Sequence, residues 1–328
     1  MQKDILVSII IPLYNKEQYF ERCFNSVVCQ AYTNIECIIV EDCSTDSSLK
    51  LAEGLIKNYT GSIRFVLIKQ KENSGVSEAR NTGINNSNGE YIFFLDADDE
   101  ITGICINSLV TLAQKYSGVD MVQGNILRYP QRSSYLDTEG KLPEYVQGNL
   151  KIEKHYPIHI PDTVWNKLIR KGFIKQNLYF KSNIRHEDAI WCFFCFKKIE
   201  TFAFTEEYTY IYHVLPDNFT NDTSHFLSIS GRLTTVEEML HNLDIDFLYK
   251  QIKEVRRLLN WQKERILSDE RYSSLMPKCQ MLLNKLPRWH FLFGLAFLEL
   301  LRTSKTTIRR VLGKKMTEKI KSFIKKDE

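Results

Sequence analysis

The sequence lacks the marks of an exported, membrane-spanning or repetitive protein. No basic segment followed by an apolar run and a small-residue cleavage site opens it, because a strand-like run occupies Ile5 to Leu13. The most apolar late stretch, 286–301, is broken by a histidine, a glycine and a glutamate, so it is too short to span a bilayer. No internal repeat or low-complexity segment is present. We therefore expect a globular protein of the cytoplasm.

A disulfide framework is also missing, although the chain has eight cysteines. Most of them lie inside apolar periodic segments rather than in loops, which fits a reducing compartment. The one C-x-x-C pair, Cys192 and Cys195, stands in WCFFCF without a second pair. A packed helix is therefore a better interpretation of this pair than zinc binding or redox chemistry.

Acidic and basic residues are nearly balanced in number, but they are unevenly placed. The net charge is +4, while residues 302–328 hold ten basic and three acidic side chains, which leaves −3 for the rest. A neutral-to-acidic body argues against a protein that grips nucleic acid over its main surface. The basic tail is expected to have an anionic partner of its own.

The basic tail also shows an apolar periodicity. Apolar residues recur at helical spacing among its lysines and arginines, which is typical of an amphipathic helix on an anionic membrane surface. A solvated helix packing back on the body would give the same pattern, but Trp289 and three nearby phenylalanines favour the membrane. We therefore expect peripheral membrane contact through 286–326.

The first part of the chain alternates short β-branched runs with helical patterns. The expected strands are 7–11, 35–40, 64–68, 91–95 and 119–123, and the helices between them are 17–30, 46–59, 76–87 and 104–117. Nearly continuous apolarity predicts strands buried on both faces. The order indicates an α/β fold with a mostly parallel sheet flanked by helices, in which ligands bind at the carboxyl ends of the strands.

The pattern changes after the fifth expected strand. Residues 124–163 contain four prolines and no sustained period, which is typical of a flap or substrate loop. Regularity then returns, with helices expected at 163–171 and 187–198, strands at 201–205 and 207–213, and only helices beyond about 230. We expect one domain over 1–235, with halves 1–123 and 124–235, and a helical C-terminal region over 236–328.

Four acidic residues follow the fourth expected strand, in YIFFLDADDE from Tyr91 to Glu100. Like charges repel and lose hydration when enclosed, so we expect a cation beside them. Strand alternation would turn Asp96 and Asp98 to the same side and Asp99 elsewhere. Hard carboxylate oxygens with few local ligands suit Mg²⁺ or Mn²⁺ completed by water and substrate phosphates. A simple turn that caps the next helix is the alternative.

A second acidic turn, VEDCSTD at 40–46, follows the second expected strand. Helix capping accounts for Ser44 or Asp46, but it does not account for Asp42, which stands where the strand ends. A carboxylate at this edge can accept a hydrogen bond from an imide N–H or a ribose hydroxyl. Asp42 is therefore the candidate for reading a base.

A third turn lies in ENSGVSEARNTG at 72–83, where Asn73, Ser74 and Gly75 come before the helix that bears Arg80. Gly75 permits backbone angles that other residues avoid, and Arg80 could pair with a diphosphate through two hydrogen bonds. An exposed arginine in a surface ion pair is the alternative for Arg80.

These turns, in this order, resemble the nucleotide-sugar half of family 2 glycosyltransferases of the GT-A fold. The resemblance covers about the first 220 residues. It rests on VSIIIPLYNKEQYFERCFNSVVCQAYTNIECIIVEDCSTDSS, NSGVSEARNTGINNSNGEYIFFLDADD, WNKLIRKGFI and RHEDAIWCFF. Each piece alone is a weak motif, whereas their order and spacing together are specific.

The resemblance implies roles for individual residues. The nucleoside would be cradled by Pro12, Tyr14, Asn15 and Asp42. Arg80 would approach the uracil or the phosphates, and the ribose would be held by Asp96 with Ala97 beside it. Asp98 would bind the metal, with help from Asp99.

Two positions differ from the usual family pattern. Cys43 stands where the family usually has glycine, which leaves the turn after Asp42 less defined. His213 stands where relatives often have arginine after a tyrosine-rich strand. It could touch the diphosphate or the metal, or be a satisfied histidine within the strand.

Inverting transfer also needs a base on the side of the sugar opposite the departing nucleotide. Glu187 and Asp188 open an expected helix, and the family's equivalent E-D pair supplies this base, usually its aspartate. We assign Asp188 as the base, with Glu187 as the alternative. An acidic pair favoured by the helix macrodipole would also explain both residues.

The resemblance therefore implies an inverting enzyme that needs Mn²⁺ or Mg²⁺ and moves one sugar from a nucleoside-diphosphate donor, UDP-linked, to a glycan hydroxyl. A lipid-linked acceptor at the inner face of the plasma membrane is expected. Lys285 stands where processive synthases have the glutamine of Q-x-x-R-W, which disfavours polymer synthesis. The alternatives are a polyprenyl-phosphate sugar transferase and a non-catalytic nucleotide-sugar-binding scaffold.

Overall fold

The computed structural model describes most of the chain up to residue 286. The described residues are 4–130, 133–134, 142–148, 151–152, 160–175, 178–182, 184–215, 226–242 and 248–286. The chain forms two compact units, of which the first comprises residues up to 183 and 187–216, and the second comprises 184–186 and the chain from 217 onward. The expected boundary at 235 falls inside helix α8 (Phe226–His241), which belongs to the second unit.

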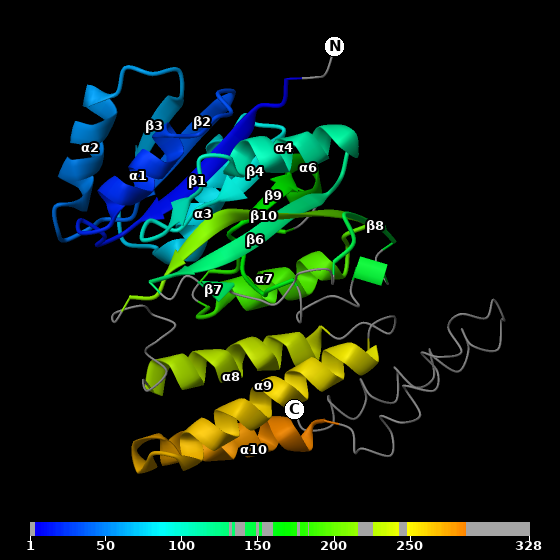
Figure 1. Cartoon of the computed structure of the whole chain (residues 1–328). Helices are drawn as coiled ribbons and strands as arrows, with labels where there is room; N and C mark the ends of the chain where they lie inside the picture. Colours follow the sequence, from blue (N-terminus) through cyan, green and yellow to red (C-terminus); the bar gives the residue numbers. More distant parts are fainter. Residues whose placement is uncertain are drawn as a thin grey trace. The chain divides into compact units, whose positions relative to one another are not determined.

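The first unit is built on a ten-stranded mixed sheet (Figure 1). Its strands are β1 (Val7–Leu13), β2 (Ile35–Glu41), β3 (Arg64–Lys69), β4 (Tyr91–Phe94), β5 (Glu100–Ile101), β6 (Met121–Tyr129), β7 (Ser133–Ser134), β8 (Tyr145–Gln147), β9 (Lys167–Arg170) and β10 (Thr201–His213). The main order is β3-β2-β1-β4-β9-β6-β10-β5. Strands β3, β2, β1 and β4 are parallel, and β9 lies antiparallel between β4 and β6. The predicted fold class is confirmed.

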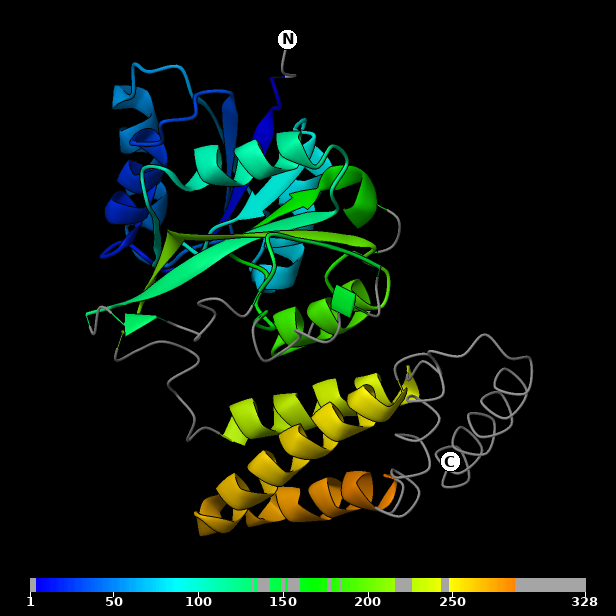
Figure 2. The same ribbon diagram turned by 45° about the vertical axis from the view of Figure 1, so that its right-hand side comes forward.

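Helices cover both faces of this sheet, as Figures 1 and 2 show. Alternation along β1 explains why: Val7 and Ile9 belong to one buried cluster and Ile10 to another. The first cluster includes side chains from α1 (Phe20–Val28), α2 (Ser48–Asn58) and α4 (Cys105–Lys115). The second includes side chains from α3 (Gly75–Asn86), α6 (Lys171–Ile174) and α7 (Glu187–Phe196).

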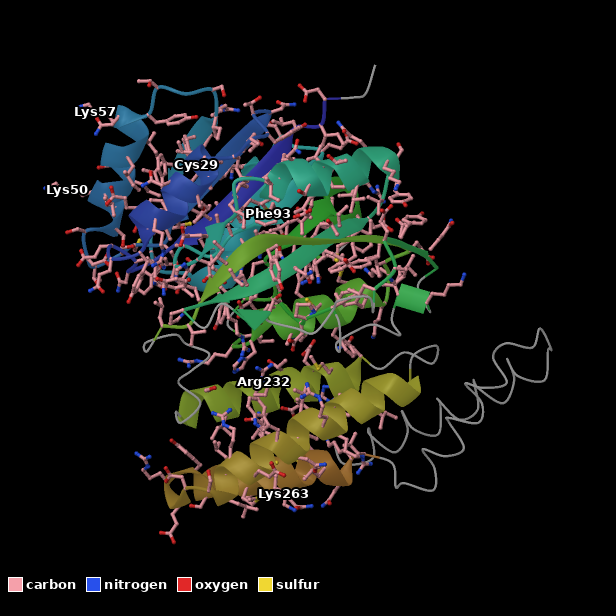
Figure 3. All side chains as sticks on the ribbon, viewed as in Figure 1. Cys29, Lys50, Lys57, Phe93, Arg232 and Lys263 are labelled. Carbon is pink, nitrogen blue, oxygen red and sulfur yellow. The ribbon has the colours of Figure 1, made fainter. Side chains whose placement is uncertain are left out.

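Burial follows this two-sided arrangement. Phe93 on β4 is fully buried within the sheet, whereas Lys50 and Lys57 project outward from α2 (Figure 3). Cys192 and Cys195 are both buried on α7. The prediction of a packed helix around this C-x-x-C pair is therefore confirmed.

One predicted helix is wrong, and two predicted strands are in fact one. The helix expected at 163–171 is instead an irregular segment followed by β9 and the short helix α6, because Leu168 and Ile169 are buried and pair with β4 and β6. The two strands expected at 201–205 and 207–213 form the single strand β10. Register shifts beside Tyr208 mark where its alternation breaks.

The second unit is helical, as predicted. Its described elements are α8, α9 (Leu248–Leu267), the 3-10 helix η2 (Glu270–Leu275) and α10 (Met276–Asn284). None of the helices in the described ranges has the length and apolarity needed to cross a bilayer. The predicted membrane contact at 286–326 lies outside the described residues except for Leu286.

Candidate active site

The loops that leave β1 and β2 are tied to each other. The backbone N–H of Asn15 donates to Ser44 Oγ (3.1 Å), and the N–H of Thr45 donates to Asn15 Oδ1 (2.7 Å). The next N–H, from Lys16, donates to Ser48 Oγ (2.7 Å). Asn15 adopts a positive φ of 49°, which asparagine tolerates better than most residues. Asn15 thus fixes the loop that carries Lys16.

Pro12 and Tyr14 flank the end of β1. Pro12 pairs in register with Val40 of β2, whereas β4 pairs with β1 only as far as Ile10. Proline has no backbone N–H to donate, and at Pro12 no residue of β4 stands opposite to accept one. The side chain of Tyr14 is exposed beyond the strand. Both residues lie at the carboxyl edge of the sheet, where the resemblance put the nucleoside.

Asp42 holds two turns together at the same edge. Its carboxylate is buried and accepts hydrogen bonds from Ser74 N–H (2.8 Å), Gly75 N–H (2.8 Å) and Gln70 Nε2 (2.9 Å). Gly75 has a φ of 84°, as its predicted role requires. Cys43 has a φ of 59°, which explains why glycine suits this position. One oxygen of Asp42 accepts a single bond and so retains capacity to accept another.

The acidic residues after β4 form a turn rather than a continuation of the strand. Strand β4 ends at Phe94, and the N–H of Asp99 donates to the carbonyl of Asp96 (3.0 Å). The expected strand alternation of Asp96 and Asp98 is therefore wrong. Ala97 between them is buried. The side chains of Asp96 and Asp98 are 29% and 16% exposed, so both carboxylates can still meet a ligand.

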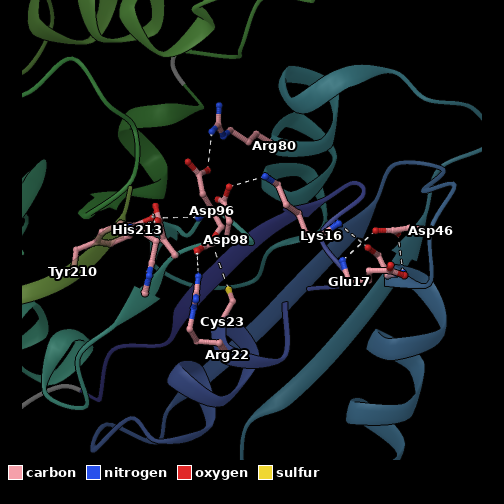
Figure 4. A network of polar contacts seen from close by, with 12 residues as sticks. Lys16, Glu17, Arg22, Cys23, Asp46, Arg80, Asp96, Asp98, Tyr210 and His213 are labelled. Atoms are coloured by element: carbon pink, nitrogen blue, oxygen red, sulfur yellow. Dashed lines mark hydrogen bonds and ion pairs between the residues drawn. The ribbon is translucent and has the colours of Figure 1, made fainter. Parts of the chain in front are cut away.

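Basic side chains of the protein itself surround this turn (Figure 4). Lys16 Nζ lies 2.6 Å from Asp98 Oδ2, and Arg80 Nη2 lies 3.0 Å from Asp96 Oδ1. Arg22 Nη2 donates to the main-chain carbonyl of Asp98 (2.6 Å). The sequence led us to expect a divalent cation that balances these acids, and it did not point to Lys16 or Arg22. A basic residue in the loop after β1 was the available signal.

Arg80 is committed to protein carboxylates. Its side chain is 4% exposed, and Nη1 lies 2.6 Å from Glu187 Oε1 while Nη2 bonds Asp96. Burial alone would lower the pKa of Arg80, but the carboxylates of Asp96, Glu187 and Asp188 outweigh it and hold the pKa above its ordinary value. Both terminal nitrogens thus contact the protein, whereas we had expected them at the diphosphate. Arg80 joins the acidic turn to helix α7.

Asp99 and His213 form hydrogen bonds within the protein, between the acidic turn and β10. Asp99 is buried and accepts hydrogen bonds from Tyr210 Oη (2.8 Å) and from the His213 N–H (2.8 Å). His213 Nε2 lies 2.6 Å from Glu100 Oε1. Burial and then the neighbouring carboxylates raise the pKa of Asp99 well above its usual range. These contacts anchor β10 to the turn. Three metal ligands were expected: Asp98, Asp99 and His213. Asp99 and His213 take part in this anchoring, whereas the carboxylate of Asp98 does not and is partly exposed.

The donor set fits a hard divalent cation bound through few protein ligands. Within the described ranges, no group of three or more histidine, cysteine, aspartate or glutamate side chains could hold a metal. Mg²⁺ and Mn²⁺ can instead be held by one or two carboxylates together with water and substrate phosphates. The partly exposed carboxylate of Asp98 could supply one such ligand.

The predicted base stands at the start of a helix. Helix α7 begins at Glu187, and Asp188 follows in its first turn, where Asp188 Oδ1 accepts the N–H of Ala189 (3.0 Å). Glu187 lies beside it and is paired with Arg80. Trp191 of the same helix packs in the core and donates to the carbonyl of Leu178 (2.5 Å).

Comparison with known proteins identifies the family. The model described as glycosyl transferase family 2 matches residues 8–187, more than half of the chain. Glycosyltransferase GlyA of Streptococcus pneumoniae serotype 4 (strain ATCC BAA-334 / TIGR4) is 29% identical over 310 residues, which cover 88% of this chain and 42% of that protein. The matches to GlyA and to two other curated glycosyltransferases cover 42%, 61% and 63% of those proteins' length, which is below two thirds in each case.

Solved structures agree on the fold. The crystal structure of Staphylococcus aureus TarS 1–349 in complex with UDP-GlcNAc has a TM-score of 0.65 at 18% identity, over 86% of this chain and 82% of that one. The mannosyltransferase PcManGT from Pyrobaculum calidifontis, in complex with GDP-Man and Mn²⁺, has a TM-score of 0.58 at 11% identity, over 98% and 85%. The architecture is that of GT-A glycosyltransferases, and the chain belongs to glycosyl transferase family 2.

Proposed function

We propose that this chain is an inverting glycosyltransferase that moves a single sugar from a nucleoside-diphosphate donor to a hydroxyl of a growing glycan. The observation that carries the proposal is the Arg80 bridge. One buried guanidinium contacts Asp96 in the acidic turn and Glu187 beside Asp188, although these residues lie far apart in the sequence. The fold thereby brings together the acidic turn and an acidic helix start, as donor binding and acceptor activation require.

The nucleoside of the donor is assigned to the carboxyl edge of β1 and β2. Pro12, Tyr14, Asn15 and Asp42 would form its cradle, and Asp96 with Ala97 would hold the ribose. We propose UDP as the nucleotide, supported by the UDP-GlcNAc complex of TarS, whose fold this chain shares. The GDP-Man complex of PcManGT indicates that this fold also accepts another base, so the choice depends on side chains such as Asp42.

Asp98 is assigned to hold Mn²⁺ or Mg²⁺ against the diphosphate. When bound, such a cation stabilises the negative charge that grows on the leaving diphosphate. Asp99 would support this from behind by fixing the turn to β10 through Tyr210 and the His213 backbone. His213, paired with Glu100, is assigned the same supporting role rather than a ligand position.

Asp188 is assigned as the base that takes the proton from the acceptor hydroxyl. Its neighbour Glu187 is engaged by Arg80 at 2.6 Å, so a proton on Glu187 would disrupt a buried ion pair. Asp188 follows Glu187 in the first turn of α7, and attack with its help from the face opposite the nucleotide would invert the anomeric centre. Glu187 and Arg80 would hold helix α7 in place.

The acceptor is proposed to be lipid-linked, which would place the protein at the inner face of the plasma membrane. The support is the basic, amphipathic sequence pattern over 286–326. The part of the first unit that follows residue 123 would form the acceptor half of the domain. A glycan attached to a membrane lipid would then meet the site while the tail holds the protein at the surface.

A panel of UDP-sugars with Mn²⁺ tests the proposed reaction through release of UDP and through product mass. Asp188→Asn should bind donor normally and lose transfer by about 10²-fold or more, since the base is removed while its shape is kept. Glu53→Gln, an exposed carboxylate paired with Lys69 on the surface, is the matched control and should react like wild type. Wild-type transfer rates in Asp188→Asn would refute the base, and a lipid phosphate-linked monosaccharide as product would favour the alternative transferase.

A further inference from the structure

The β1–α1 loop places a lysine on the carboxylate proposed to bind the metal. Lys16 Nζ lies 2.6 Å from Asp98 Oδ2, with side-chain exposures of 31% and 16%. Two hydrogen bonds fix the backbone around it: Lys16 N–H donates to Ser48 Oγ (2.7 Å), and the N–H of Glu17 donates to Asp46 Oδ2 (3.1 Å). The contact is therefore held by the fold over a separation of 82 residues along the chain (Figure 4).

Lys16 and a divalent cation would compete for the carboxylate of Asp98. A cation coordinated by Asp98 Oδ2 must displace the ammonium or share the carboxylate with it, and two like charges a few Å apart repel strongly where water is partly excluded. Arg22 does not compete in this way, because its Nη2 bonds the Asp98 main-chain carbonyl (2.6 Å) and not the carboxylate. Lys16 is thus the side chain in direct competition with the metal.

We infer that Lys16 is an internal counter-ion that exchanges with the divalent cation at Asp98 and makes cation binding depend on the nucleotide. This inference rests on the proposed donor and metal site. The diphosphate of a donor offers two negative charges, and Lys has a flexible stem that can move its ammonium from Asp98 to those phosphates. Cation and nucleotide therefore bind cooperatively, whereas the cation alone must overcome the Lys16–Asp98 pair.

Mn²⁺ binding, followed by the electron paramagnetic resonance signal of the free ion, tests this with and without UDP. Lys16→Met keeps the length of the side chain and removes its charge, and Lys16→Gln is a second neutral variant should the first fold poorly. Without UDP, both should bind Mn²⁺ about threefold to thirtyfold more tightly than wild type, as expected for releasing a partly exposed ion pair. UDP should strengthen Mn²⁺ binding less in these variants than in wild type.

Two further variants separate the possible results. Lys50→Met removes an exposed lysine on α2 and should leave Mn²⁺ binding unchanged. Adding Asp98→Asn to Lys16→Met should abolish the gained affinity, which locates it at Asp98. If UDP enhances Mn²⁺ binding in wild type but the Lys16 variants match wild type within twofold, the inference fails alone. If wild type shows no enhancement, the proposed donor and metal site fails, and the inference with it.

Discussion

Replacing Arg80 with methionine should destabilise the first unit by about 3 kcal/mol. Arg80 is 4% exposed and lies 3.0 Å from Asp96 and 2.6 Å from Glu187, so its loss leaves two acids without their cation. Breaking a buried ion pair costs roughly 3–5 kcal/mol, and the lower end applies because Asp96 is 29% exposed and keeps part of its hydration. Methionine fills most of the volume beside Phe180, so little of the loss should come from a cavity.

Urea unfolding can be followed by thiol labelling, with the label on the peptide that holds Cys37 measured by mass spectrometry. Cys37 is a buried free cysteine on β2, so its labelling reports on the first unit alone. Because the uncompensated Glu187 carboxylate causes part of the loss, adding Glu187→Gln to Arg80→Met should recover about 1–2 kcal/mol relative to the sum of the single changes. Arg64→Met is the matched control: its side chain is 67% exposed at 3.4 Å from Glu36, and its loss should cost less than about 1 kcal/mol. Additive effects, or a loss below about 1 kcal/mol for Arg80→Met, would refute the bridge.

Three other positions give separate tests. His186 has a φ of 61°. Burial, and then the charge of Arg232, lower the pKa of His186 to about 3, below its value in the unfolded chain. The free energy of unfolding should therefore fall as the pH drops from about 6.5 toward about 3, by about 2 kcal/mol at pH 5. His186→Asn, which tolerates positive φ, should flatten acid unfolding followed by circular dichroism, and an unchanged profile would contradict this. Cys43→Gly should stabilise the fold by about 0.5 kcal/mol in thermal melts by relieving φ strain, and a lower melting temperature would oppose that reasoning. Asp120 is buried and accepts both the N–H and the hydroxyl of Thr201 at 3.0 Å, so Asp120→Ala should cost about 2–4 kcal/mol in urea unfolding; a loss under about 1 kcal/mol would show that water replaces it.

The parallel strands of the sheet could be predicted because each is marked by the residues of its own segment. The runs that became β1, β2, β3 and β4 begin where the sequence placed them, at residues 7, 35, 64 and 91. Buried strands such as β2 and β4 need nearly unbroken apolar and β-branched residues, and the half-buried edge strand β3 keeps such a run in its middle. Strand β9 could not be predicted in the same way. Its four residues are fixed as a strand by pairing with β4 and β6, which lie far away in the sequence.

The position of the candidate site could be predicted from the sequence, but the contacts between its side chains could not. The acidic turn and the helix start at Glu187 carry unusual charge where elements begin or end, and that can be seen in the sequence. Lys16 cannot be distinguished from an ordinary surface lysine until the β1–α1 loop approaches the turn after β4. Arg80 likewise could pair with phosphate or protein, and only the buried geometry shows that it bonds Asp96 and Glu187.

The acidic turn needs less help from a metal than its sequence suggests. The sequence led us to expect that only a bound divalent cation could make so many carboxylates tolerable. The structure shows that Lys16, Arg22 and Arg80 already balance much of this charge. The metal proposal therefore rests on the partly exposed carboxylate of Asp98 and on the chemistry of a diphosphate, and no longer on charge balance.

Calorimetric titration of UDP into the purified chain tests the central claim, that Asp98 holds a divalent cation against a nucleoside diphosphate. The account predicts UDP binding with Mn²⁺ present, weakened about tenfold or more by a chelator, and equally weak in Asp98→Asn whether or not Mn²⁺ is added. UDP binding of the same strength in wild type with Mn²⁺ and with chelator would contradict it.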